Sequence, residues 1–202
     1  MQAVWGYAGS RLWRLKVTLE SVIRFSGSVV RRRRDSGIRV ARYGRRVSKR
    51  YFEDFKVGEV FASGEEYEIT PDRLHDYASE FDPQPIHLDA EVANQEMFGG
   101  IVASGWHSLS VTMRLVVRSQ IFGGAPVVGV GIDRLRFLQP VRAGDQLRAE
   151  AEVLEVRASG SNAGRGYIVL RITTRRQDDS PVLAQDWTVL VPRRPPGALV
   201  GA

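Results

Sequence analysis

The sequence predicts one α+β domain in which a largely antiparallel sheet wraps a single buried helix. The stretch 105–120 carries apolar residues on nearly all sides at helical spacing, which is typical of a buried helix. Four runs of about ten alternating or β-branched residues follow it, at 127–138, 146–156, 167–176 and 182–191. Because only short turn sequences separate these runs, we expect the successive strands to pair antiparallel.

Shorter elements precede the predicted helix. Alternating residues indicate short strands near 59–62 and 65–70. Thr70 followed by Pro71 is a typical helix start, because the hydroxyl can cap the first turn and proline fits the first helical position. A second short helix is expected at 90–94, so strands and short helices lead into the buried helix.

Composition limits the possible classes of protein. A chain of 202 residues is long enough for one ordinary domain, and the absence of cysteine excludes disulfides, cysteine-ligated zinc and thiol catalysis. The net charge of +6 is unevenly distributed. Residues 1–50 hold 14 of the 29 basic residues and two acids, which leaves 51–202 with a net charge of −6. We therefore expect no specific binding of nucleic acid by the folded domain.

Residues 1–50 form a basic, arginine-rich extension, followed by the domain at 51–192 and a C-terminal tail at 193–202. The spacing of apolar residues predicts an amphipathic helix over 11–25. Charged residues interrupt this stretch too often for it to cross a bilayer. Three interpretations of the extension remain open: an organellar transit peptide, a contact with an anionic membrane surface, and a flexible segment. The expected location of the protein is the cytoplasm.

The residues best suited to chemistry lie in the stretch D-P-Q-P-I-H at 82–87. Asp82 and His87 are five residues apart, and the two prolines between them are expected to exclude a regular helix and to stiffen the turn. A carboxylate and an imidazole held together can move protons to and from a water molecule. Gly105 opens the predicted buried helix, where free N–H groups favour a developing negative charge.

Each of these residues also has a structural interpretation. Asp82 could cap a turn, His87 could be a hydrogen-bonded interior histidine, and Gln84 could orient the turn or touch a substrate. His75 is expected at the surface or behind the site, and His107 is expected to be packed and hydrogen-bonded. The spacing of histidines and acids gives no metal-binding signature, so no metal site is predicted.

Three stretches resemble the MaoC-like dehydratases and R-specific enoyl-CoA hydratases, which have the hotdog fold. Residues 82–87 resemble that family's motif of an acid, any residue, Asn-Pro, an aliphatic residue and a histidine. The second stretch is 51–58, which begins Y-F-E-D-F and includes V-G. The third stretch is 98–107, with the sequence F-G-G-I-V-A-S-G-W-H. The similarity covers about 51–192, and Gln84 departs from it by replacing the usual asparagine.

The resemblance implies a curved antiparallel sheet wrapped around a long central helix. It also implies that Asp82 and His87 are the catalytic pair, and that the Gly105 N–H is the donor to the oxyanion of the thioester carbonyl. Five further residues would bind substrate or support the site: Gln84, Pro85, Ile86, Ser104 and Trp106. The implied assembly is a homodimer, or a higher homo-oligomer built from it, in which two sheets join edge to edge.

The implied reaction is reversible hydration of 2-enoyl thioesters to R-3-hydroxyacyl thioesters, a step of fatty acid metabolism. The acyl carrier would be coenzyme A or an acyl carrier protein, and no cofactor would be needed. Two alternatives remain: an acyl-CoA thioesterase of the same fold, and a non-catalytic protein that binds an acyl thioester or a protein partner. The thioesterase is disfavoured because 105–120 contains no Asp or Glu.

Overall fold

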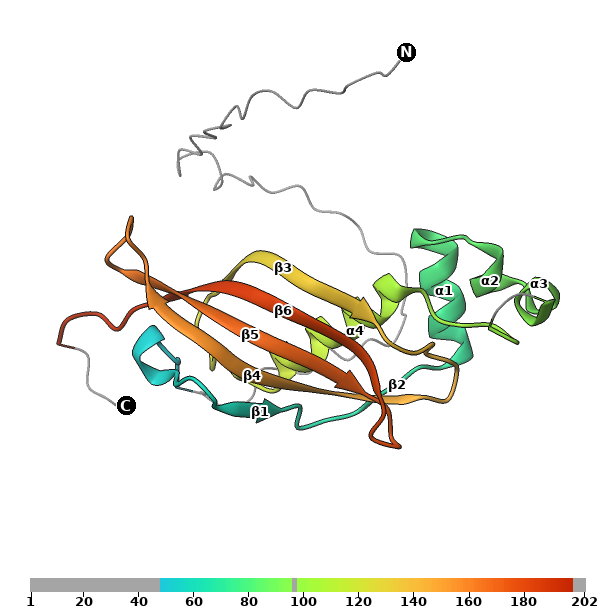
Figure 1. Cartoon of the computed structure of the whole chain (residues 1–202), viewed down its shortest axis with the longest axis horizontal. Helices are drawn as coiled ribbons and strands as arrows, with labels where there is room; N and C mark the ends of the chain where they lie inside the picture. The colour runs from blue at the N-terminus through green and yellow to red at the C-terminus, as the bar shows by residue number, and fades with distance from the viewer. Residues whose placement is uncertain (1–47, 96–97, 198–202) are drawn as a thin grey trace, which may run out of the picture. The chain divides into compact units, whose positions relative to one another are not determined.

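The computed structural model describes residues 48–95 and 98–197 (Figure 1). The chain divides into two units, Met1–Arg42 and Tyr43–Ala202, and every element described below belongs to the second. The helix expected over 11–25 lies outside the described residues. Within the described part, six strands and a long helix confirm the α+β class, with a curved antiparallel sheet lying across the helix (Figure 1).

The four long strands lie within a few residues of their predicted positions. All neighbouring strands pair antiparallel in the order β1-β4-β5-β6-β3, and β2 pairs separately with β4. Alternating residues of β4 and β5 are buried, because one face of the sheet covers the core and the other faces solvent. The strands are β1 (Val60–Ala62), β2 (Tyr67–Glu68), β3 (Val128–Phe137), β4 (Gln146–Ala158), β5 (Arg165–Arg175) and β6 (Pro181–Pro192).

Helix α4 (Gly105–Arg118) lies against one face of the sheet, and its buried side supplies much of the core (Figure 1). Leu115 and Val116 are buried there, and the Thr112 hydroxyl lies 2.7 Å from the Thr174 hydroxyl of β5. The expectation that this helix is buried on nearly all sides is wrong. Its opposite side exposes apolar side chains, which include Trp106, Met113 and Val117.

Four short helical elements complete the domain: η1 (Phe52–Asp54), α1 (Pro71–Phe81), α2 (Pro85–Leu88) and α3 (Ala90–Gln95). The Thr70 hydroxyl accepts a hydrogen bond from the Arg73 N–H (3.3 Å), which confirms the predicted start of α1. Helix α2 corrects the expectation that the prolines exclude a helix before His87. Pro85 occupies the first helical position, where its missing N–H costs nothing.

Arginine side chains near both ends of the domain contact its aromatic and acidic residues. The Arg50 guanidinium lies 4.5 Å from the centres of both the Phe55 and Phe61 rings, and Arg193 pairs with Glu53 at 2.8 Å. Arg50 and Arg193, which flank the predicted domain at 51–192, therefore pack against it. No helix in 48–95 or 98–197 has both the length and the apolar character that crossing a bilayer requires.

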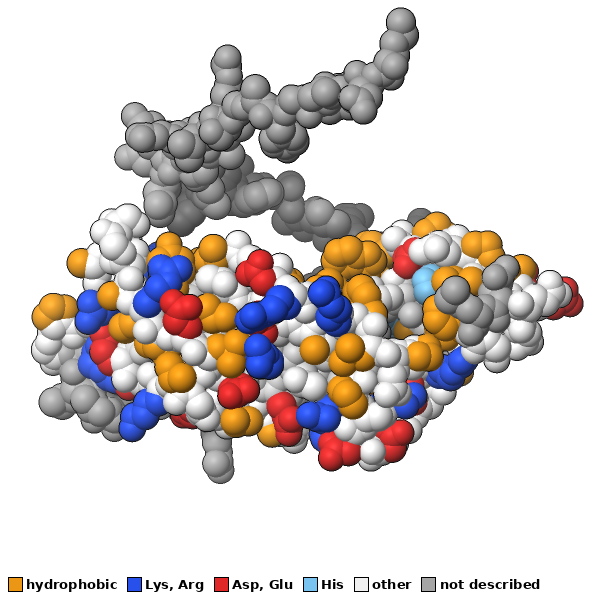
Figure 2. All heavy atoms as spheres, viewed as in Figure 1, with side chains coloured by type: hydrophobic (Ala, Val, Ile, Leu, Met, Phe, Trp, Pro, Cys, Tyr) orange, Lys and Arg blue, Asp and Glu red, His pale blue; other side chains and the backbone are white. Residues whose placement is uncertain are grey.

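The face of the sheet that points away from α4 is charged without being dominated by one sign (Figure 2). Basic and acidic side chains alternate over it. Asp186 on β6 is buried beneath Arg134 of β3 and Arg171 of β5, and its carboxylate pairs with both. These contacts neutralise charge across three strands.

Candidate active site

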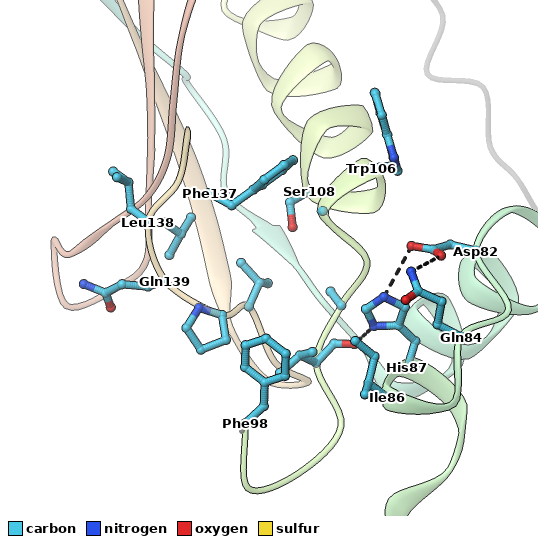
Figure 3. A pocket seen from close by; sticks show the side chains of 16 residues that line it. Asp82, Gln84, Ile86, His87, Phe98, Trp106, Ser108, Phe137, Leu138 and Gln139 are labelled. Atoms are coloured by element: carbon cyan, nitrogen blue, oxygen red, sulfur yellow. Dashed lines mark hydrogen bonds and ion pairs between the residues drawn. The ribbon is translucent and has the colours of Figure 1, made fainter. Parts of the chain in front are cut away.

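The predicted pair meets where α1 ends and α2 begins. Asp82 is the residue that closes α1, with its N–H bonded to the Ala78 carbonyl (2.9 Å), and His87 lies on α2. The Gln84 N–H donates to the Asp82 carbonyl at 2.7 Å and closes the turn between the helices. This turn brings His87 Nε2 to 3.3 Å from Asp82 Oδ2 (Figure 3).

A main-chain carbonyl fixes the protonation pattern of the histidine. His87 is only 6% exposed, and its Nδ1 lies 2.8 Å from the Val102 carbonyl oxygen. A carbonyl can only accept, so Nδ1 must carry a proton and Nε2 is the nitrogen that faces Asp82. In neutral imidazole Nε2 is itself an acceptor, so a direct hydrogen bond to the carboxylate at 3.3 Å requires a proton on Nε2, and a water molecule could contact both atoms only from the cavity beside them. The pair is therefore suited to holding a reacting water.

Two donors hold Asp82 in its ionised form. The Ser104 hydroxyl donates to Oδ2 at 2.6 Å, and the Gln84 side-chain amide donates to Oδ1 at 2.7 Å. These hydrogen bonds, Ser104 first and Gln84 second, lower the pKa of Asp82 below its usual value, and the nearby His87 adds to the effect. A carboxylate that stays ionised can accept a proton throughout the neutral range.

The start of α4 supplies a donor at the edge of the same region. Ser104 is the N-cap, and its hydroxyl accepts from the Trp106 N–H at 3.2 Å while it donates to Asp82. Gly105 is the first residue of the helix and lines the cavity, and its N–H has no acceptor among the described residues. A free N–H at a helix start can stabilise negative charge on an oxygen.

Gly105 is also constrained by an aromatic ring from the sheet. A Cβ atom at this position would lie 2.7 Å from Cε1 of Phe137, the last residue of β3, which is far closer than packed carbons come. The glycine therefore makes room for Phe137, in addition to any room it leaves for a ligand. Phe137 remains 55% exposed and covers one side of the helix start.

These groups surround a cavity of about 420 Å³. The Asp82 and His87 side chains lie on one side of it, and Phe137 and Leu138 lie on the other (Figure 3). Apolar side chains form most of the remaining wall: Ile86, Phe98, Val102, Pro140, Val141 and Val182. A proton-transferring pair beside an apolar chamber suits a small reactive group attached to a hydrocarbon chain.

The supporting residues predicted from the sequence divide into two groups. Gln84, Ile86 and Trp106 line the cavity. Pro85 does not line it and begins α2, while Ser104 is buried behind the cavity and contacts Asp82. The structure thus brings all eight predicted residues to one region, although not all of them face the chamber.

Sequence reasoning missed the apolar wall opposite the pair. Phe137 ends an exposed strand and Leu138 follows it. The β3–β6 register shifts between Asp133 and Arg136, so simple alternation does not show which way Phe137 points. The Val102 carbonyl was also missed. A main-chain acceptor has no side-chain signature, and only the three-dimensional path of the chain reveals it.

The other histidines lie outside the pair. His107 is buried and stacks on Tyr77 with ring centres 4.7 Å apart, and burial, aided by the positive charge of Arg73, lowers its pKa. Packing of His107 is confirmed, but its Nδ1 lacks the expected hydrogen-bond partner. His75 is exposed, as expected. Among the described residues, no three potential ligands gather to hold a metal ion.

We expect Ser104→Ala to shift the pH dependence of any activity that requires ionised Asp82. Removing the hydroxyl removes the largest cause that lowers the carboxyl pKa, so the pKa rises toward its usual value. The acidic limb of the rate profile should then move to higher pH, with less change at neutral pH. Steady-state rates measured across the acidic range for both proteins would test this, and an unmoved acidic limb would contradict it.

A curved antiparallel sheet wrapped around one long helix is the hotdog fold, and here it holds a carboxylate and an imidazole at the start of that helix. The family described as MaoC like domain matches residues 54–170, more than half of the chain, and the protein belongs to that family. The resemblance inferred from the sequence motifs is thereby confirmed.

Individual relatives agree with this assignment. The crystal structure of the MaoC-like dehydratase from Rhodospirillum rubrum is 36% identical, with a TM-score of 0.64 over 72% of this chain and 98% of that one. The uncharacterised protein YdeM of Bacillus subtilis is 28% identical over 70% of this chain and 98% of its own length. The 3-hydroxyacyl-thioester dehydratase Z of Mycobacterium tuberculosis is 28% identical over 58% of this chain and 76% of its own.

Proposed function

We propose that the protein catalyses the reversible addition of water to a 2-enoyl thioester, giving an R-3-hydroxyacyl thioester. The observation that carries this proposal is the placement of the Asp82 and His87 side chains, 3.3 Å apart, on the cavity that Gly105 also lines. Hydration of such a substrate needs a group to move protons and a donor to hold the thioester oxygen. Membership of the MaoC-like family supports the same reaction class.

The reaction follows from this geometry. A water molecule in the cavity, in contact with Asp82 Oδ2 and His87 Nε2, gives one proton to the pair, and its oxygen forms a bond to C3 of the substrate. The double-bond electrons move toward the thioester carbonyl, whose oxygen becomes negative and accepts from the Gly105 N–H. The pair then returns a proton to C2, so water is added across the double bond and the enzyme is unchanged.

The substrate would be carried as a thioester of coenzyme A or of an acyl carrier protein, as in fatty acid metabolism. The name of the mycobacterial relative, a 3-hydroxyacyl-thioester dehydratase, supports this class of substrate. Because only water and protons move, the proposed reaction requires no cofactor. The cytoplasmic location and the transit or membrane role of residues 1–50 stay predictions from the sequence.

The test is turnover by the purified full-length protein with a series of enoyl-CoA thioesters, beginning with crotonyl-CoA. We expect the absorbance of the conjugated enoyl thioester to fall with the wild type and to remain nearly constant with His87→Ala. Release of free thiol from acyl-CoA would instead identify a thioesterase. Saturable binding without any turnover would identify a non-catalytic binding protein, and either result would reject the proposal.

We further propose that two copies assemble through β3. This strand is at the edge of the sheet, and it exposes the apolar side chains Val128, Val130 and Ile132. A groove of about 530 Å³ between β3 and α4 continues the apolar surface and includes Met113 and Val117 of α4. An apolar edge of this kind favours pairing with a second sheet, and a homodimer would cover it.

We expect Ile132→Lys to weaken this dimer, because a lysine on an edge strand opposes strand addition. Sedimentation of the wild type should give the mass of two chains, and the variant should shift toward the mass of one. Val57→Lys is the matched control, since Val57 is 66% exposed and lies outside β3, the groove and the cavity. A monomeric wild type, or equal dissociation of both variants, would rule out this interface.

A further inference from the structure

The segment 98–104 supports three parts of the site at once. Its Val102 carbonyl binds His87 Nδ1 at 2.8 Å, and its Ser104 hydroxyl binds Asp82 Oδ2 at 2.6 Å. It ends at Gly105, where α4 begins. A displacement of this segment would therefore disturb the imidazole, the carboxylate and the helix start together.

One arginine from the turn between β3 and β4 holds this segment. The Arg142 guanidinium donates through Nη1 to the Ile101 carbonyl (3.3 Å) and through Nη2 to the Phe98 carbonyl. The next residue back along the turn, Val141, accepts from the Ala103 N–H at 2.7 Å. The turn thus contacts the segment at three successive points, close to the carbonyl that binds His87.

The turn that carries Arg142 is itself firmly held. The Arg142 N–H donates to the buried Asp145 carboxylate at 2.8 Å, and the Asp145 N–H donates to the Arg142 carbonyl at 3.2 Å. Among the described residues, no carboxylate forms an ion pair with the guanidinium, and its hydrogen bonds go to two main-chain carbonyls. The planar guanidinium of arginine has several N–H donors in a fixed arrangement and can donate to two carbonyls at once. A lysine ammonium is less suited to this.

We infer that Arg142 is a positioning residue, which holds the segment 98–104 so that the Val102 carbonyl keeps His87 Nε2 directed at Asp82. Arg142 does not line the cavity, so any effect on the reaction is transmitted through the segment. Its expected kinetic effect rests on the proposed hydration reaction. Its effect on the imidazole does not, and can be measured without substrate.

We expect Arg142→Met to lower kcat by about 10- to 100-fold, because small misplacements of catalytic groups cost rates of this order. KM should change less than kcat, since Arg142 itself does not line the cavity. Arg142→Lys should recover part of the loss, because it retains a donor but cannot span both carbonyls. These constants would be measured with the full-length protein and the best enoyl-CoA substrate.

Arg148→Met is the matched control. The Arg148 guanidinium is also partly buried, donates to the Arg176 carbonyl (2.9 Å) and pairs with Asp179, and Arg148 neither lines the cavity nor contacts segment 98–104 through a hydrogen bond. The two methionine variants should lose similar thermal stability, but only Arg142→Met should lose kcat. Equal kcat losses in both variants would show a general effect on folding and overturn the inference.

The ring nitrogens of His87 give a direct measurement. The chain has three histidines, so nitrogen-15 labelling of histidine gives a simple NMR spectrum, and His87→Gln identifies the His87 signals. With neutral imidazole, the wild type should show Nδ1 protonated and Nε2 unprotonated. In Arg142→Met we expect these signals to move toward the values of a tautomer mixture, while those of exposed His75 stay constant.

The two proposals can fail separately. Unchanged His87 signals in Arg142→Met would overturn the positioning role, even if the wild type hydrates enoyl thioesters. Altered His87 signals together with an inactive wild type would support the positioning role and reject the proposed hydration. Altered signals with an unchanged kcat would overturn the claim that the positioning serves the reaction.

Discussion

Replacing Asp82 with Asn should lower kcat for hydration about 1,000-fold, in the middle of the range for loss of a catalytic acid or base. The amide has nearly the same shape, but it cannot accept a proton from the bound water. Its oxygen can still accept from Ser104, so the local structure should survive. Single-turnover and steady-state rates with the same enoyl-CoA would measure the loss.

Asp76→Asn provides the matched control for this change. Asp76 lies on α1, which Asp82 closes, and its carboxylate is exposed and does not line the cavity. Wild-type activity is expected for this variant, and far-ultraviolet circular dichroism should show that both variants are folded. Substantial hydration by Asp82→Asn would remove Asp82 from the mechanism.

Gly105→Ala should lower kcat/KM about 100-fold, comparable to the loss of one oxyanion donor. The new methyl group would lie 2.7 Å from the Phe137 ring, so either the ring or the start of α4 must move. Movement of the helix start would displace the N–H from the thioester oxygen. The same kinetic assay measures the loss, and Gly64→Ala is the control because that position has open space.

A double variant separates the two reasons for a glycine at this position. If the Phe137 ring is the constraint, Gly105→Ala combined with Phe137→Ala should be more active than the two single losses predict. If the glycine instead leaves room for substrate, removing the ring will not relieve the defect. Purely additive losses would therefore contradict the role of Phe137 described above.

The main elements of the fold could be predicted because their signals extend over many residues. The strands β4 and β5 alternate buried and exposed residues along most of their length, and Thr70 marks the start of α1 locally. Helix α2 was missed because Pro85 was interpreted as a helix breaker, although proline is accepted at a first position. The sequence did not predict that one side of α4 is exposed, because apolar residues on that side were expected to be buried in the core of the domain.

The structure places predicted site residues side by side where the chain itself brings them together. Only four residues lie between Asp82 and His87, and Ser104 directly precedes Gly105, so local spacing was informative. Phe137 and Arg142 follow more than thirty residues later. Their contacts depend on how β3 and its following turn lie across the start of α4, which no local pattern encodes.

The main-chain acceptor of His87 has a consequence for how relatives of this protein can diverge. Because the Val102 carbonyl makes the contact, exchange of the valine for another residue that fits leaves the hydrogen bond in place. Deletion of a single residue between 98 and 102 would instead change which carbonyl reaches the imidazole, even with every catalytic side chain retained. In such relatives the length of this segment carries functional information that residue identity at position 102 does not.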